Sequence, residues 1–100
     1  MIHIQWTNKA FNELELLSEE PAFHIIRQAD SLKNFTEMGV LLKTINSKLK
    51  ELRQLTIKRK WRVIYEFDEY EKTIFILSVQ NCRQKLLSMR DLRRRKREID

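Results

Sequence analysis

The spacing of apolar residues divides the chain into a helical first half and a second half with the two-residue period of β-strands. Residues 2–6 alternate apolar and polar side chains, which predicts a short strand. Thr7 follows as a candidate helix cap. A first helix over about residues 8–18 is predicted by apolar residues at helical spacing, namely Ala10, Phe11, Leu14 and Leu17.

A second helix is predicted over residues 21–38, where it would form a hairpin with the first. Pro21 suits the first position of a helix. Gly39 is predicted to adopt the left-handed conformation just past the helix end. Residues 40–48 fit either a loop or one more helical turn. The stripe that predicts the helix consists of Phe23, Ile26, Ala29, Leu32 or Lys33, Phe35 and Met38.

Three strands are predicted after residue 50, over residues 50–57, 61–68 and 73–80. Their connections are short, which favours antiparallel neighbours. After Asn81 the helical spacing returns, and the apolar residues that could dock this last helix are Leu86, Leu87, Met89 and Leu92.

The pattern therefore predicts an α+β fold. An N-terminal strand and a helical hairpin pack on one face of an antiparallel sheet, and a basic C-terminal helix follows. Residues 1–100 are expected to form a single domain, with 93–100 as a basic tail that can fray into solvent.

The composition agrees with a globular protein, because 42% of the residues are apolar. No apolar run reaches the ~18 residues of a membrane span, and the N-terminus lacks the features of a signal peptide. The single cysteine, Cys82, cannot form an internal disulfide. We expect a cytoplasmic protein that does not enter a membrane.

The net charge of +6 is confined to the second half of the chain. Residues 1–50 hold six basic and six acidic residues, whereas residues 51–100 hold fourteen and eight. Eight basic residues and one acid, Asp91, lie within 83–97. Such clustering indicates a polyanionic partner, either nucleic acid or an acidic protein, although a solvated basic helix has the same composition.

The strand over residues 61–68 raises the question of why Arg62 interrupts an apolar segment. Successive side chains point to opposite faces of a sheet. Arg62 therefore shares a face with Ile64 and Glu66, whereas the face toward the helices carries Trp61, Val63, Tyr65 and Phe67. We expect the Arg62 face to be open.

Other basic residues are expected to converge on this open face. If Leu52 faces the helices, Arg53 lies beside Arg62, and Arg83 and Lys85 follow the last strand. Converging arginines can hold a phosphate through bidentate hydrogen bonds. The alternative is that Arg62 forms an ordinary cross-strand pair with Glu51 or Glu66.

Four segments of the chain resemble the RelE/ParE toxin superfamily of type II toxin–antitoxin systems. "SKLKELRQL", "KWRVIYEFD" and "TIFILSV" resemble three successive strands of that superfamily, and "NFTEMGVLL" is similar to the helix end of its HigB-like branch. The resemblance covers residues 30–80. It implies metal-independent cleavage of messenger RNA, usually on the ribosome, in which the 2′-hydroxyl attacks the adjacent phosphorus.

The resemblance also implies roles for individual residues. Arg53 and Arg62 match the two arginines of the catalytic site, with Arg62 stabilising the transition state, and Arg83 and Lys85 are further catalytic candidates. No cofactor is implied, and the expected partners are a cognate antitoxin, messenger RNA and the ribosome. The basic residues expected to bind nucleic acid are Lys58, Arg59, Lys60, Arg90, Arg93, Arg94 and Arg97.

One feature of the superfamily is missing, because no Tyr or His follows Tyr70. Proton transfer would fall to Lys58, Lys60, Lys85, Glu51 or an arginine, and these side-chain types do not titrate near neutral pH in model peptides. His3 and His24 are expected to be structural, and Cys82 a small filler. Two alternatives stay open: a ParE-like, non-enzymatic inhibitor of DNA gyrase, and an inactive homologue that only binds an antitoxin.

Overall fold

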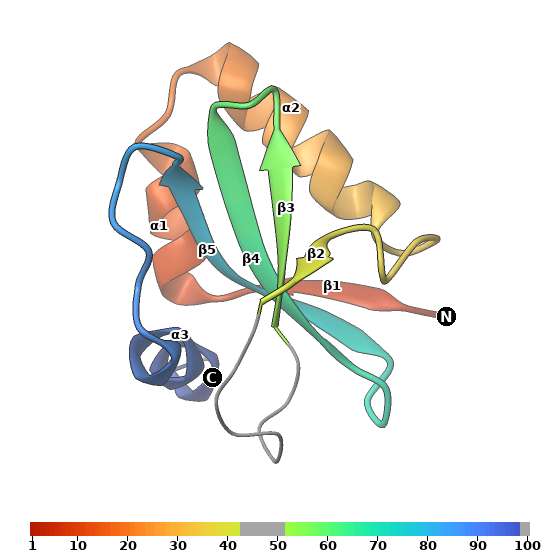
Figure 1. Cartoon of the computed structure of the whole chain (residues 1–100). Helices are drawn as coiled ribbons and strands as arrows, with labels where there is room; N and C mark the ends of the chain where they lie inside the picture. The colour runs from red at the N-terminus through yellow and green to blue at the C-terminus, as the bar shows by residue number, and fades with distance from the viewer. Residues whose placement is uncertain (43–51, 99–100) are drawn as a thin grey trace.

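The computed structural model describes residues 1–42 and 52–98 and has the predicted α+β fold. Its sheet has the strand order β1-β5-β4-β3-β2 (Figure 1). The first strand differs from the prediction, because it joins the sheet at one edge, parallel to β5. The strands are β1 (His3–Trp6), β2 (Val40–Leu41), β3 (Leu52–Ile57), β4 (Trp61–Asp68) and β5 (Thr73–Asn81), and the helices are α1 (Asn8–Glu15), α2 (Glu19–Ser31) and α3 (Met89–Arg97).

The two N-terminal helices each begin directly after a polar N-cap residue. α2 begins at Glu19, two residues before the predicted start, so Pro21 is its third residue and not its first. The Thr7 hydroxyl accepts a hydrogen bond from the Ala10 amide at 3.2 Å, which confirms the predicted cap of α1. Ser18 is the N-cap of α2, and Glu19 and Glu20 place negative charge in its first turn, where the helix dipole favours it.

Helix α2 ends seven residues earlier than predicted, and its buried stripe has a different phase. The residues that it turns into the core are Ile25 and Ala29, while Phe23 and Ile26 are exposed. After Ser31 the chain continues in tight turns rather than in a helix. Phe35 and Met38 lie in these turns and are exposed. Their helical spacing is the reason that the predicted helix was too long.

Gly39 does not adopt the predicted left-handed conformation. It is needed for close packing, because a Cβ atom there would lie 2.8 Å from the Tyr65 ring and 2.9 Å from the Gln54 carbonyl oxygen. The Tyr65 hydroxyl accepts a hydrogen bond from the Gly39 amide at 2.9 Å and donates one to the Thr36 carbonyl at 2.8 Å. Burial raises the pKa of Tyr65 above its ordinary value, so the phenol keeps its donor proton to a higher pH than an exposed tyrosine does.

The three long strands match the prediction closely. β4 has the predicted bounds, β5 is one residue longer, and the part of β3 that can be compared begins at Leu52 because residues 50–51 lie outside the described residues. The β3–β4 connection is a tight turn closed by a hydrogen bond from the Lys60 amide to the Ile57 carbonyl. Its central residues, Lys58 and Arg59, both have positive φ, at 54° and 58°, as a type I′ hairpin turn requires.

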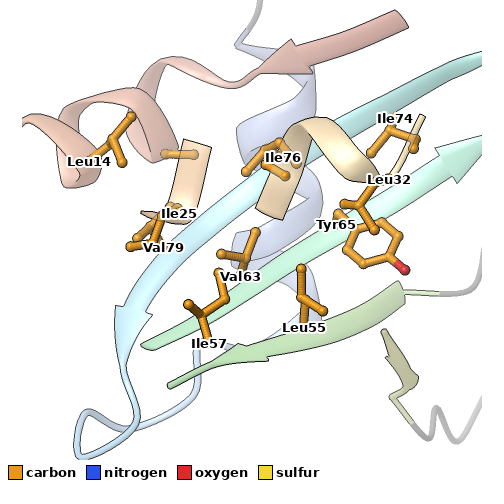
Figure 2. Close-up of a cluster of buried hydrophobic side chains, with 12 residues drawn as sticks. Leu14, Ile25, Leu32, Leu55, Ile57, Val63, Tyr65, Ile74, Ile76 and Val79 are labelled. Atoms are coloured by element: carbon orange, nitrogen blue, oxygen red, sulfur yellow. The ribbon is translucent and has the colours of Figure 1, made fainter. Parts of the chain in front are cut away.

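The sheet buries apolar residues on both faces, which contradicts the predicted open face. On the first face, side chains from α1, α2 and the strands form the larger cluster, which includes Leu14, Ile25, Val63 and Ile76 (Figure 2). The second face carries a smaller cluster of Leu52, Ile64, Phe75, Leu77 and Leu92. Leu92 comes from α3 and is fully buried, which corresponds to a stabilisation of about 1.5–3 kcal/mol. Strands with apolar residues on both sides need a cover on both sides, and α3 covers the second face.

Candidate nucleic-acid interface

Arg53 and Arg62 lie on opposite faces of the sheet, so the prediction that they converge is wrong. The register pairs Arg53 with Tyr65 and Leu52 with Glu66, which places Leu52 on the second face and Arg53 on the first. The Nη1 atom of Arg53 donates to the Gly39 carbonyl at 2.9 Å. Arg53 therefore helps to hold the α2–β2 connection against the sheet.

Arg62 lies on the second face, where its guanidinium group contacts the connection between β5 and α3. Its Nε atom donates to Gln80 Oε1 at 3.2 Å, and its Nη2 atom donates to the Gln84 carbonyl. The Gln80 side chain in turn donates to the Lys85 carbonyl at 3.4 Å. These bonds fix the orientation of Arg62 and bring the exposed residues Arg83 and Lys85 into its neighbourhood.

A β-bulge in the β4–β5 pairing is what places Gln80 beside Arg62. The register shifts between Ile64 and Tyr65, so that Arg62 pairs with Gln80 at one end of the ladder. The extra residue reverses the facing of the following side chains on β5. Nothing in the sequence pattern reveals this shift.

The β3–β4 turn joins the same region. Trp61 pairs with Asn81, and the Cys82 amide donates to the Lys60 carbonyl at 2.8 Å. Figure 1 shows this turn and the end of β5 at the same end of the sheet. Three chain segments thus bring six basic residues to one place, which we call the basic end: Lys58, Arg59, Lys60, Arg62, Arg83 and Lys85.

Within residues 1–42 and 52–98, no carboxylate forms an ion pair with any residue of the basic end. Glu66, considered above as a partner of Arg62, binds Lys96 instead, at 2.7 Å. Glu51 lies outside the described residues. The positive charge of the basic end is therefore available to an anion from solvent.

His24 lies closer to this region than expected. Its Nε2 atom is 3.0 Å from Lys58 Nζ, and Glu20 Oε1 is 4.0 Å from the same ring nitrogen. A neutral imidazole can accept a hydrogen bond from the lysine ammonium group in this geometry. The contact joins residues 34 positions apart and depends on how α2 crosses the β3–β4 turn, so no sequence signal could have found it. His3 lies on the edge strand β1, and Cys82 is partly buried with a free thiol.

Helix α3 separates its basic residues into two groups. Arg95 binds Glu13 at 2.7 Å and the Leu77 carbonyl at 2.9 Å, and Lys96 binds Glu66 and lies 4.5 Å from the centre of the Phe75 ring. Residues 93–97, which the sequence analysis assigned to a tail that could fray, belong to this helix. The other four arginines line a shallow groove of about 440 Å³ that we call the arginine face: Arg90, Arg93, Arg94 and Arg97.

The part of the chain that the structure describes contains no group of three or more His, Cys, Asp or Glu side chains arranged to hold a metal ion. Over the same residues, no helix has the length and hydropathy that a membrane crossing requires.

Comparison with solved structures shows that proteins with the same arrangement of elements are known. The isolated RelE toxin of E. coli superposes with a TM-score of 0.68 at 11% identity, covering 94% of this chain and 98% of that one. The RelBE2 toxin–antitoxin complex from Mycobacterium tuberculosis gives 0.63 at 17% identity, covering 80% and 96%. The archaeal RelE–RelB complex from Pyrococcus horikoshii OT3 gives 0.67 at 17% identity, covering 84% and 98%.

No protein-family model and no curated protein matches the sequence. The solved structures nevertheless match the fold that the four short segments predicted. The assignment to the HigB-like branch stays a prediction. The superposition with the E. coli RelE toxin covers 94% of this chain, so it includes most of the described helices and strands. The chain has the fold of the RelE toxins.

Proposed function

We propose that this chain is the toxin of a type II toxin–antitoxin system and cleaves messenger RNA without a metal ion, on the ribosome in the cytoplasm. The single observation that carries the proposal is the basic end. There a fixed arginine, Arg62, lies at the same end of the sheet as five other basic residues and has no acidic ion-pair partner among the described residues. Proteins with this fold include structures described as RelE toxins and RelBE complexes, which supports both the activity and a cognate antitoxin as partner.

In the proposed reaction the 2′-hydroxyl oxygen of one ribose attacks the adjacent phosphorus. The bond from phosphorus to the 5′-oxygen of the next nucleotide breaks, and that oxygen takes up a proton as the 2′-hydroxyl loses one. The products are a 2′,3′-cyclic phosphate and a free 5′-hydroxyl. Negative charge builds up on the non-bridging phosphate oxygens in the transition state, which is where a cationic site accelerates the reaction.

Arg62 is the residue best placed to stabilise that charge. Its Nε and Nη2 atoms are engaged with Gln80 and Gln84, which fixes the plane of the guanidinium group. Its Nη1 atom donates to no group within the described part of the chain and is free to bind a phosphate oxygen. A donor held in place before the reaction costs no reorganisation, and Arg83 and Lys85 add positive charge beside it.

The proposal assigns Arg53 a different role from the one that the resemblance implied. Its side chain faces α2 and donates to the Gly39 carbonyl, on the far side of the sheet from Arg62. We therefore place Arg53 in the framework of the α2–β2 connection rather than among the residues that touch RNA.

Expression in a bacterial host without an antitoxin tests this function. We expect growth to stop and transcripts to shorten, and Arg62→Ala to restore growth while the protein still accumulates. Growth arrest with intact transcripts and broken chromosomal DNA would support the ParE-like gyrase inhibitor instead. Normal growth with soluble, folded protein would support the inactive, antitoxin-binding homologue.

A further inference from the structure

The arginine face of α3 is a second concentration of positive charge, separate from the basic end. Its four side chains occur at positions i, i+3, i+4 and i+7 of the helix, so they form one surface stripe. Asp91 lies 3.8 Å from Arg94 and is the only carboxylate in an ion pair with this stripe among the described residues. The stripe therefore keeps most of its charge.

Arg93 is the residue of this stripe that has buried donor atoms without hydrogen-bond partners among the described residues. Its Nε and Nη2 atoms are shielded from water and have no hydrogen-bond partner. Buried donors without partners are rare, because each costs the desolvation of its N–H group. These two atoms form one edge of the guanidinium plane, the edge that grips two oxygens of a phosphate or carboxylate at once. A bound oxyanion would satisfy both atoms once the Arg93 side chain turned this shielded edge toward the groove.

The rest of α3 shows that this stripe is not needed to hold the helix in place. Leu92 is buried in the second cluster, and Arg95 and Lys96 form the ion pairs that join α3 to the sheet. The four arginines lie on the remaining surface and line the groove. Among the described residues, none of the four forms an ion pair with the sheet.

We propose that the arginine face binds the phosphates of a single-stranded RNA that flank the one held at Arg62. This inference rests on the proposed function for its choice of substrate. Helix α3 covers the second face, on which Arg62 also lies, and the segment that Arg62 contacts leads directly into α3. Arg90 to Arg97 spans about 10 Å of helix, so the stripe is long enough to face the phosphates of more than one nucleotide.

The chemistry of the stripe favours RNA over an acidic protein segment. Protein interfaces are centred on buried apolar or aromatic anchors, whereas nucleic-acid interfaces are more polar and more positive. The groove is lined by arginines alone, and the apolar residues of α3 that the structure describes, Met89 and Leu92, pack into the second cluster.

Binding of a fluorescein-labelled 2′-O-methyl RNA of twelve nucleotides to the full chain tests the proposal. This probe lacks the attacking hydroxyl, so binding is measured without cleavage. We expect Arg90→Gln/Arg93→Gln/Arg97→Gln to weaken binding at least tenfold, and to lower the slope of log K against log salt by about 2, since each lost phosphate contact removes about 0.7. Arg93→Lys keeps the positive charge but loses the pair of guanidinium donors that can bind two oxygens at once. It should weaken binding several-fold with little change in the slope of log K against log salt.

Arg27→Gln is the matched control, because it removes one exposed arginine from α2, on the other side of the sheet. It should bind RNA like the unaltered chain, and circular dichroism should show every variant folded. Unchanged affinity and salt slope in the triple variant would overturn the proposal. So would tighter binding of a twelve-residue polyglutamate than of RNA at the same salt, because the groove would then accept an acidic protein segment.

The outcomes separate this inference from the proposed function. If the triple variant binds RNA normally while Arg62→Ala abolishes transcript cleavage, the arginine face does not bind the flanking phosphates. The proposed function is then still supported. If the triple variant loses RNA binding while Arg62→Ala leaves cleavage or growth arrest unchanged, the arginine face binds RNA as proposed. The catalytic role assigned to Arg62 is then wrong.

Discussion

Tyr65 links β4 to the α2–β2 connection through a single hydroxyl group. It lies in the middle of β4, fully buried, yet it bonds to the backbone of Thr36 and Gly39 in the α2–β2 connection. Arg53 donates to the Gly39 carbonyl from the neighbouring strand. Side chains of the sheet thus hold the α2–β2 connection in place. The absence of a Cβ at Gly39 lets this connection lie close to the Tyr65 ring.

We expect Tyr65→Phe to lower the free energy of unfolding by about 1–3 kcal/mol, because the Gly39 amide and the Thr36 carbonyl each lose a partner. The phenol also predicts a dependence on pH. Burial raises the pKa of Tyr65 above the ordinary 10.0, so the unfolded chain gives up the proton at a lower pH than the folded one. This contribution is complete below pH 10 and is lost as the pH rises through the folded-state value.

Urea denaturation at pH 7 and at several values above pH 10 checks both statements. The unaltered chain should lose stability across the alkaline range more steeply than Tyr65→Phe. The exposed Tyr70 gives a matched control, since Tyr70→Phe should change neither the stability at pH 7 nor its alkaline decline. Equal alkaline slopes for the unaltered chain and Tyr65→Phe would contradict the assignment.

The facing of β3 shows which residue positions a sequence pattern can and cannot predict. β4 was predicted correctly because its apolar side chains define one phase clearly, with Val63 and Tyr65 in the first cluster. In β3, Leu55 and Ile57 fit one phase and Leu52 the other, since that strand buries apolar residues on both faces. Choosing Leu52 as the guide reversed the strand and placed Arg53 wrongly beside Arg62.

At the scale of elements, α3 is held by charges as much as by apolar contacts. Only Leu92 among its residues is fully buried. Arg95 meets Glu13, which also accepts hydrogen bonds from the Val79 amide at 3.0 Å and the Ser78 hydroxyl at 3.3 Å. Glu13 therefore connects α1, β5 and α3 through one carboxylate.

Glu13→Ala is expected to lower the free energy of unfolding by about 1–3 kcal/mol, because Arg95 loses its ion-pair partner and the Val79 amide loses its acceptor. Lys33→Ala is the control: it breaks an exposed pair with Asp30 at 2.9 Å and should change stability by less than about 1 kcal/mol. Thermal and urea unfolding measure both. Similar small effects would mean that the Glu13 network adds little to the fold.

The sequence predicted where most elements begin but was less reliable for where α2 ends. A helix cap is a local sequence signal, so Thr7 correctly predicted the start of α1. The end of α2 is not local, because Phe35 and Met38 continue the helical spacing while the chain there is shaped by hydrogen bonds to Tyr65. The antiparallel strands were predictable from their short connections, whereas the parallel pairing of β1 with β5 required three dimensions.

At the scale of the whole molecule, the proposed function depends on how three segments meet at one end of the sheet. The charge excess in the second half of the chain predicted a basic surface, and the structure separates that charge into the basic end and the arginine face. The β-bulge and the contact of His24 with Lys58 could not have been predicted, because both arise from packing between distant residues.

The most direct test of the central claim is the single-turnover rate of messenger RNA cleavage by the purified full chain on translating ribosomes. We expect Arg62→Ala to reduce this rate by 10²–10³, about 2.7–4 kcal/mol, as for the loss of one fixed donor to a charged transition state. Arg53→Ala, compared at a temperature where both variants are folded, should stay within about tenfold of the unaltered chain. Cleavage that survives Arg62→Ala but disappears with Arg53→Ala would contradict the account.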